Sequence, residues 1–198
     1  MFRGLAYVIL GWVLIATVGS LGHMMHITAV LPSTTIALLL HLGFGGRRER
    51  LSLAFGLTIA LVLGYLEDLH QGGPPGVLSL THGLTYVIVH FAARRFAVDG
   101  WRARVGAGIL LCFLTDLCTW GVLSTLAGGF QLSTAGLRSG LALMPWRALE
   151  TGLIVNPVWL LADTIFSRLG PGRRGLRGQL SARSSTWEPE SGGDVHVE

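Results

Sequence analysis

Acidic side chains inside apolar stretches are the residues of this chain that could do chemistry. Glu67 and Asp68 close one apolar run, and Asp116 lies within another, LLCFLTDLCTWG. A charged group at membrane depth is costly, so each acid is a candidate for proton transfer, ligand binding or partner contact. For Asp116, the deepest, three interpretations stay open: a structural aspartate bonded to adjacent threonine hydroxyls, to His90 or to backbone; a ligand or proton site; a contact with another subunit.

Histidines raise the separate question of a metal site. His23, His26, His70 and His82 are expected on one side of the membrane. A zinc site needs three or four ligands that converge at about 2 Å, whereas these residues come from three separate places and lack a ligand spacing such as HExxH. We therefore expect histidines at the membrane interface, with neither metal nor cofactor.

Three charged residues in the last apolar segment have simpler interpretations. Arg147 and Glu150 are three residues apart, which predicts a local ion pair on one helix. Asp163 lies near the end of the segment, where its side chain can reach the interface beside Arg168. Neither observation points to catalysis.

Catalytic signatures of membrane enzymes are missing from the sequence. It has no GxSG with a matching histidine, no GxGD, no HExxH, no P-loop and no repeated aspartate pattern like that of CDP-alcohol phosphotransferases. Short loops also leave little room for a polar active site. A non-enzymatic protein is expected, with an intramembrane enzyme remaining only if Asp116 and another polar group meet at a wet pocket.

The elements that must position these residues are membrane helices. Of 198 residues, 51% are hydrophobic and 13% are charged, which lies outside the composition of soluble domains. The first apolar run follows a basic start, as in a signal peptide, but its length and the apolar segment directly after it favour a retained helix. Hydropathy predicts an all-α membrane protein with about six transmembrane helices, at 5–22, 28–44, 51–69, 76–93, 104–127 and 145–167.

Arginines predict the topology independently of hydropathy. Every basic residue is arginine, and thirteen of the fifteen fall at the start, in the loops near 47 and 98, and in the tail, leaving Arg138 and Arg147 for the other side. Because basic residues collect in cytoplasmic loops, both termini should be cytoplasmic and residues 23–26, 64–76 and 128–140 should be outside. Residues 1–169 form the membrane domain, and 170–198, rich in Gly, Ser and charge, a disordered tail.

The third predicted helix carries a face of small residues and ends in two acids. Gly56, Ala60 and Gly64 recur every four residues and permit close approach of a neighbouring helix; the alternatives are ordinary packing within the bundle and a partner-binding face. At about 100° per residue, Glu67 lies about 20° from the centre of this face and Asp68 about 80°. Glu67 should therefore point inward as a polar contact, and Asp68 toward the next turn as its cap.

The stretch GYLEDLHQGGPPG, residues 64–76, predicts a turn between two helices. Glycines after the helix favour a C-terminal stop, and Pro74 and Pro75 suit the first turn of the next helix. Together with its neighbours, LGYLEDLHQGGPPGVLSLTHGL resembles the most typical segment of the MreD family of rod shape-determining membrane proteins, in which an aspartate is followed at four-residue intervals by two glycines.

In this sequence the family positions are Asp68, Gly72 and Gly76, with Pro32 opening the second helix and ETGLIVNPVWLLADTIFSRL similar to the family's last helix. Ser33 departs from the acidic or amide residue that often follows this proline. The resemblance covers all six helices but not the tail.

The resemblance implies a non-catalytic scaffold of the bacterial cell-wall elongation complex, located in the inner membrane as a multi-pass protein. Its expected partners are an MreC-like single-span protein and, through it, a RodA-type glycosyltransferase and a class B penicillin-binding protein; nucleic acid is not an expected partner. The family fold is similar to that of the S components of ECF vitamin transporters. The alternative function is therefore a substrate-binding transporter subunit with a ligand near His70, His82 and Asp116.

Overall fold

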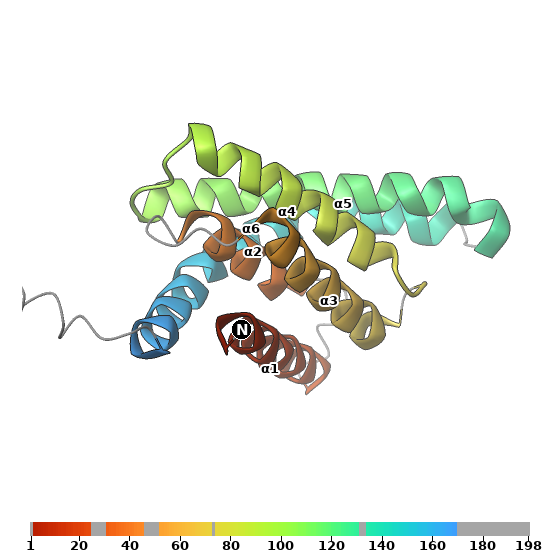
Figure 1. The fold of residues 1–198 in the computed structure, drawn as a ribbon. Coiled ribbons are helices and arrows are strands. Elements are labelled where there is room, and N and C mark those ends of the chain that lie inside the picture. The colour runs from red at the N-terminus through yellow and green to blue at the C-terminus, as the bar shows by residue number, and fades with distance from the viewer. Residues whose placement is uncertain (1, 25–30, 46–51, 73, 131–133, 170–198) are drawn as a thin grey trace, which may run out of the picture.

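A computed structural model describes residues 2–24, 31–45, 52–72, 74–130 and 134–169, and all regular elements in these ranges are helices. The order along the chain, drawn in Figure 1, is α1 (Phe2–Met24), α2 (Thr34–Phe44), α3 (Leu53–Gln71), α4 (Val77–Arg95), α5 (Trp101–Phe130) and α6 (Thr134–Leu169). The prediction of an all-helical chain with six helices is confirmed. The predicted tail, 170–198, and His26 lie outside the described residues.

Four of the helices are long and apolar enough to cross a membrane. The qualifying segments are Arg3–Met24, Leu53–Gln71, Trp101–Thr125 and Gly140–Arg168. α4 is as long as α3, with 19 residues, but it carries several threonines and histidines, some of them buried within the bundle. The chain therefore has the build of a multi-pass membrane protein.

α2 is shorter than the sequence predicts. Residues 31–33 are not helical, and α2 has 11 residues, a rise of only about 16 Å. The prediction of a helix through these positions was wrong because Pro32 disfavours helical geometry in the residue before it and Ser33 begins the helix as its N-cap, its hydroxyl accepting from the Ile36 N–H.

α5 and α6 are longer than predicted. Residues 128–130 end α5 and 134–140 begin α6, so the expectation of an outer loop over 128–140 was wrong for these positions. Hydropathy identifies the apolar part of a helix. It does not identify the residue at which the helical backbone hydrogen bonds end. Pro145, expected at a helix start, instead lies inside α6 together with Pro157.

The core forms around α2, which contacts every other described helix. All residues from Thr34 to Leu42 are buried. α3 and α4 pack as an antiparallel hairpin, as do α5 and α6, while α1 lies at the edge of the bundle (Figure 1) with much of its apolar surface exposed. Because the longer helices surround α2, polar side chains from several of them can meet beside it.

Candidate functional site: a buried charged cluster and its cavity

Asp68 joins the end of α3 to the start of α4. Its carboxylate accepts three backbone hydrogen bonds, from the N–H groups of Gly76 at 2.8 Å, Leu78 at 3.1 Å and Ser79 at 3.3 Å. The first N–H groups of a helix have no partner inside the helix, and negative charge is favourable there. Asp68 therefore has the geometry of the cap expected from its position on α3.

The two motif glycines provide the backbone that this cap requires. Gly72 and Gly76 have φ angles of 66° and 95°, in the left-handed region that favours glycine. Gly72 ends α3, with its N–H bonded to the Asp68 carbonyl at 3.1 Å. Gly76 is the N-cap of α4 and has no side chain to satisfy that helix, so Asp68 does so across the turn. Pro74 and Pro75 were predicted to lie in the first turn of α4. That prediction was wrong, because α4 begins at Val77 and both prolines lie before it.

The side chain of Glu67 points the other way, into the bundle, and is 5% exposed. Its Oε1 atom accepts from Gln71 Nε2 at 2.8 Å and from Ser33 Oγ at 3.5 Å. The same oxygen lies 3.4 Å from Nη2 of Arg147 on α6. The inward orientation inferred from helical geometry agrees with these contacts.

His82 of α4 faces Glu67 from the opposite side. Its Nε2 is 3.3 Å from Glu67 Oε2, and its Nδ1 is 2.7 Å from the Leu78 carbonyl oxygen. The contact with Glu67 has the distance of an ion pair but not the alignment of a hydrogen bond, so neither of these two buried atoms has a directed partner. With its side chain 1% exposed, His82 is buried in the core of the bundle.

Arg147 connects the two inward-facing acids. Besides Glu67, its guanidinium contacts Asp116 of α5, with 3.4 Å between Nη1 and Oδ1. The predicted local pair with Glu150 was therefore wrong. The predicted partners of Asp116 were wrong as well, because its described contacts are Arg147 and the Cys112 thiol, whose Sγ is 3.8 Å from Oδ2.

We call Glu67, His82, Asp116 and Arg147 the charged cluster. Its members come from α3, α4, α5 and α6, and α2 borders it through Ser33, whose N–H donates to Thr151 of α6 at 2.9 Å. Breaking a buried ion pair by removing one partner is strongly destabilising. The charged cluster thus links four helices through side-chain contacts.

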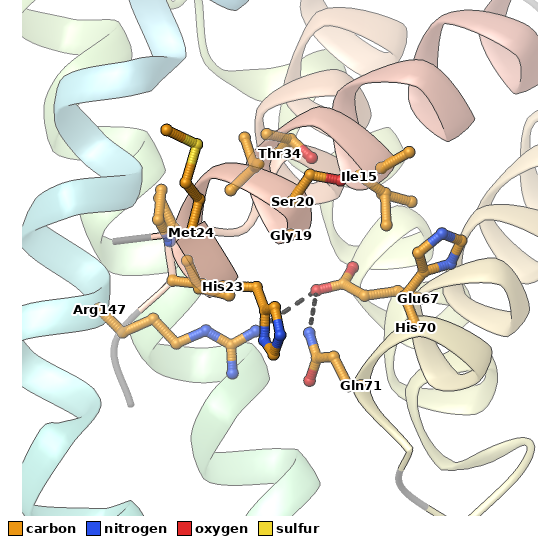
Figure 2. A pocket seen from close by; sticks show the side chains of 14 residues that line it. Ile15, Gly19, Ser20, His23, Met24, Thr34, Glu67, His70, Gln71 and Arg147 are labelled. Carbon is orange, nitrogen blue, oxygen red and sulfur yellow. Dashed lines mark hydrogen bonds and ion pairs between the residues drawn. The ribbon is translucent and has the colours of Figure 1, made fainter. Parts of the chain in front are cut away.

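An open cavity of about 790 Å³ adjoins the charged cluster. Figure 2 shows Glu67, Gln71 and Arg147 directed toward one another on one wall, with the two contacts of Glu67 dashed. The opposite wall comes from α1, through residues such as Ile15 and Gly19. This volume lies in the range of small-molecule sites. One wall carries both charge signs and the α1 wall is mainly apolar, with Ser20 and His23 as its polar members, so the cavity suits an amphipathic molecule.

His23 and His70 line this cavity. Among the described residues, no group of three or more histidine, cysteine or acidic side chains could hold a metal ion.

A second polar group lies at the other end of α2. His41 Nε2 contacts Asp163 Oδ1 at 2.9 Å, so Nδ1 is left to accept from the Tyr7 hydroxyl at 2.8 Å. Asp163 was expected to extend beside Arg168 but contacts His41, with its side chain 52% exposed. The rings of Trp159 and Phe166 surround His41. The arrangement links α1, α2 and α6 structurally.

The small-residue face of α3 packs against α4, inside the bundle. A Cβ at Gly64 would lie 2.6 Å from the Leu78 carbonyl oxygen and from Ser79 Cα, and one at Gly56 would overlap the Tyr86 ring. Ala60 is fully buried. These contacts favour the packing interpretation of this face over a partner-binding one.

The structure groups the predicted site residues into two sets. Asp68, Gly72 and Gly76 form the turn, and Glu67 and Asp116 meet through Arg147. Sequence reasoning missed His82 and Arg147 as members of the charged cluster. The available signal was charge balance: two inward-facing acids need a cation at their depth, and Arg147 is one of only two arginines assigned to that side.

The fold and site define a helical multi-pass membrane protein with a charged cluster beside an open cavity. No family model, curated protein or solved structure matches the chain.

Proposed function

We propose that this chain is a non-catalytic scaffold subunit of the MreD type, which binds an MreC-like single-span protein in the bacterial inner membrane. Through that partner it would position a RodA-type glycosyltransferase and a class B penicillin-binding protein. Its mechanism is contact through helix faces and outer turns, without bond making. Both termini are cytoplasmic in this proposal.

The observation that carries the proposal is the structural role of each motif residue. Asp68 caps α4, Gly72 ends α3, and Gly76 begins α4 with a positive φ angle. The residues on which the resemblance rests are thus the ones that a closed α3–α4 hairpin requires. A rigid hairpin at the membrane surface is a suitable element for holding a partner.

Co-purification tests this function. The chain is co-expressed with the MreC-like protein of the same genome, and the complex is isolated through a tag on that partner. We expect a stable complex with the wild type and a weaker one with Asp68→Ala, while Leu69→Ala, at an exposed neighbouring position, serves as the matched control. Failure of the wild-type chain to bind this partner would contradict the proposal.

The cavity favours a second candidate, a substrate-binding subunit of an ECF-type vitamin transporter. A pocket of about 790 Å³ with Glu67 and Arg147 on its wall could enclose a vitamin-sized molecule. This candidate requires a small molecule retained by the purified protein and an energising ATPase as partner. Co-purification with such an ATPase and not with the MreC-like protein would favour it.

A further inference from the structure

The contact between Glu67 and His82 requires a proton that neither residue holds in its ordinary neutral-pH form. His82 Nδ1 lies 2.7 Å from the Leu78 carbonyl oxygen. A carbonyl oxygen only accepts hydrogen bonds, so Nδ1 carries the hydrogen. A neutral imidazole has one N–H group, which leaves Nε2 as an unprotonated acceptor.

This acceptor faces a second acceptor. Nε2 is 3.3 Å from Glu67 Oε2, and an ionised carboxylate has no hydrogen to donate. A water molecule between the two atoms would need about 2.7–3.0 Å on each side, so 3.3 Å leaves no room for one. Both atoms are buried without a hydrogen-bond partner, an arrangement that is costly unless one of the two carries a proton.

Charge balance in the charged cluster leads to the same conclusion. Two carboxylates, Glu67 and Asp116, face one guanidinium, Arg147. With a neutral His82 the charged cluster would hold one uncompensated negative charge at a depth where such charge is expensive. One additional proton makes it neutral, whether it is held by Glu67 and His82 or by Asp116, and only the first position also relieves the contact between two acceptors.

The other groups around the charged cluster do not replace this proton. The hydroxyls of Thr35 and Ser33 can donate to the Glu67 carboxylate, but they give no hydrogen to Nε2 of His82. α5 contributes the Cys112 thiol beside Asp116. The remaining titratable groups nearby, His23 of α1 and His70 of α3, line the cavity. His70 has its Nδ1 bonded to the Leu66 carbonyl at 2.9 Å, away from the contact between Glu67 and His82.

We propose that Glu67 and His82 form a buried site that binds one proton, taken from water in the cavity. Glu67 connects the two regions because it lines the cavity while its Oε2 atom faces His82. Binding adds one hydrogen ion and one positive charge, and no other bond changes. The bound proton makes the 3.3 Å contact an ion pair between α3 and α4, and its release leaves two acceptors in contact. The site stands independently of the scaffold function.

Nitrogen NMR of histidine-labelled protein in lipid bilayers at neutral pH tests the proposal. The His82 signal is assigned through its backbone neighbours. We expect both of its ring nitrogens to be protonated; a neutral His82 beside a protonated Glu67, detected as a carboxylic acid band in the infrared, also places the proton between them. A His82 with unprotonated Nε2 beside an ionised Glu67 would overturn the proposal.

Glu67→Gln is the informative variant. Its side-chain amide can donate to Nε2 and removes one negative charge, so His82 should become neutral with the hydrogen on Nδ1. An unchanged, doubly protonated His82 in a folded Glu67→Gln protein would also overturn the proposal. If this variant fails to fold, the wild-type spectra alone decide the outcome.

Discussion

Replacing Arg147 with alanine removes the guanidinium that contacts both Glu67 and Asp116. Each contact is 3.4 Å long, and the two carboxylate side chains are 5% and 8% exposed. Removing one partner from a buried ion pair costs about 3–5 kcal/mol. Because the Arg147 side chain borders the cavity and is 24% exposed, we expect the lower end, about 3 kcal/mol.

Reversible unfolding in detergent or bicelles measures this free energy of unfolding. The matched control is Glu150→Ala on the next turn of α6, which removes a charge but no contact of the charged cluster. A rescue variant combines Arg147→Met with Glu67→Gln and Asp116→Asn, so that no uncompensated acid remains. It should recover much of the lost stability, since well-packed uncharged groups often replace buried ion pairs without loss. An Arg147→Ala protein as stable as the control would refute the reasoning.

Three further changes test the turn, the packing and the second polar group. Asp68→Ala leaves three N–H groups of α4 without an acceptor and should lower the unfolding free energy by about 2 kcal/mol, against little change for Leu69→Ala. Gly64→Ala should lower it by about 1–3 kcal/mol because the new Cβ meets α4 backbone, whereas Gly19→Ala, with no atom within 4 Å, should be neutral or stabilising; equal effects would contradict the packing. Asp163→Asn should cost less than about 1 kcal/mol because Asp163 is half exposed, and a larger loss in the same assay would mean that its contact with His41 is a main support of α2.

Local rules were sufficient for the acids and glycines of the turn, although not for its prolines. The spacing of Asp68, Gly72 and Gly76 and the known needs of helix ends predicted which acid would face the start of α4 and which would face the bundle. These features depend on residues within about a dozen positions of one another. Local geometry, unlike long-range pairing, can be derived from helical periodicity.

The charged cluster could be predicted only in part, because its pairs join residues 15 to 80 positions apart. Arg147 had a plausible partner on its own helix, Glu150, and the sequence does not reveal how α6 is rotated about its axis. His82 was grouped with the outer histidines, and the sequence does not reveal that its ring is buried against Glu67 of α3. Tertiary packing decided both outcomes.

Native mass spectrometry of the gently purified protein, co-expressed with the MreC-like protein, tests the central claim most directly. One spectrum reports bound proteins and bound small molecules together. The scaffold function predicts a mass equal to this chain plus the MreC-like partner, without a stoichiometric small molecule. A chain that carries a vitamin-sized ligand and no MreC-like partner would contradict it.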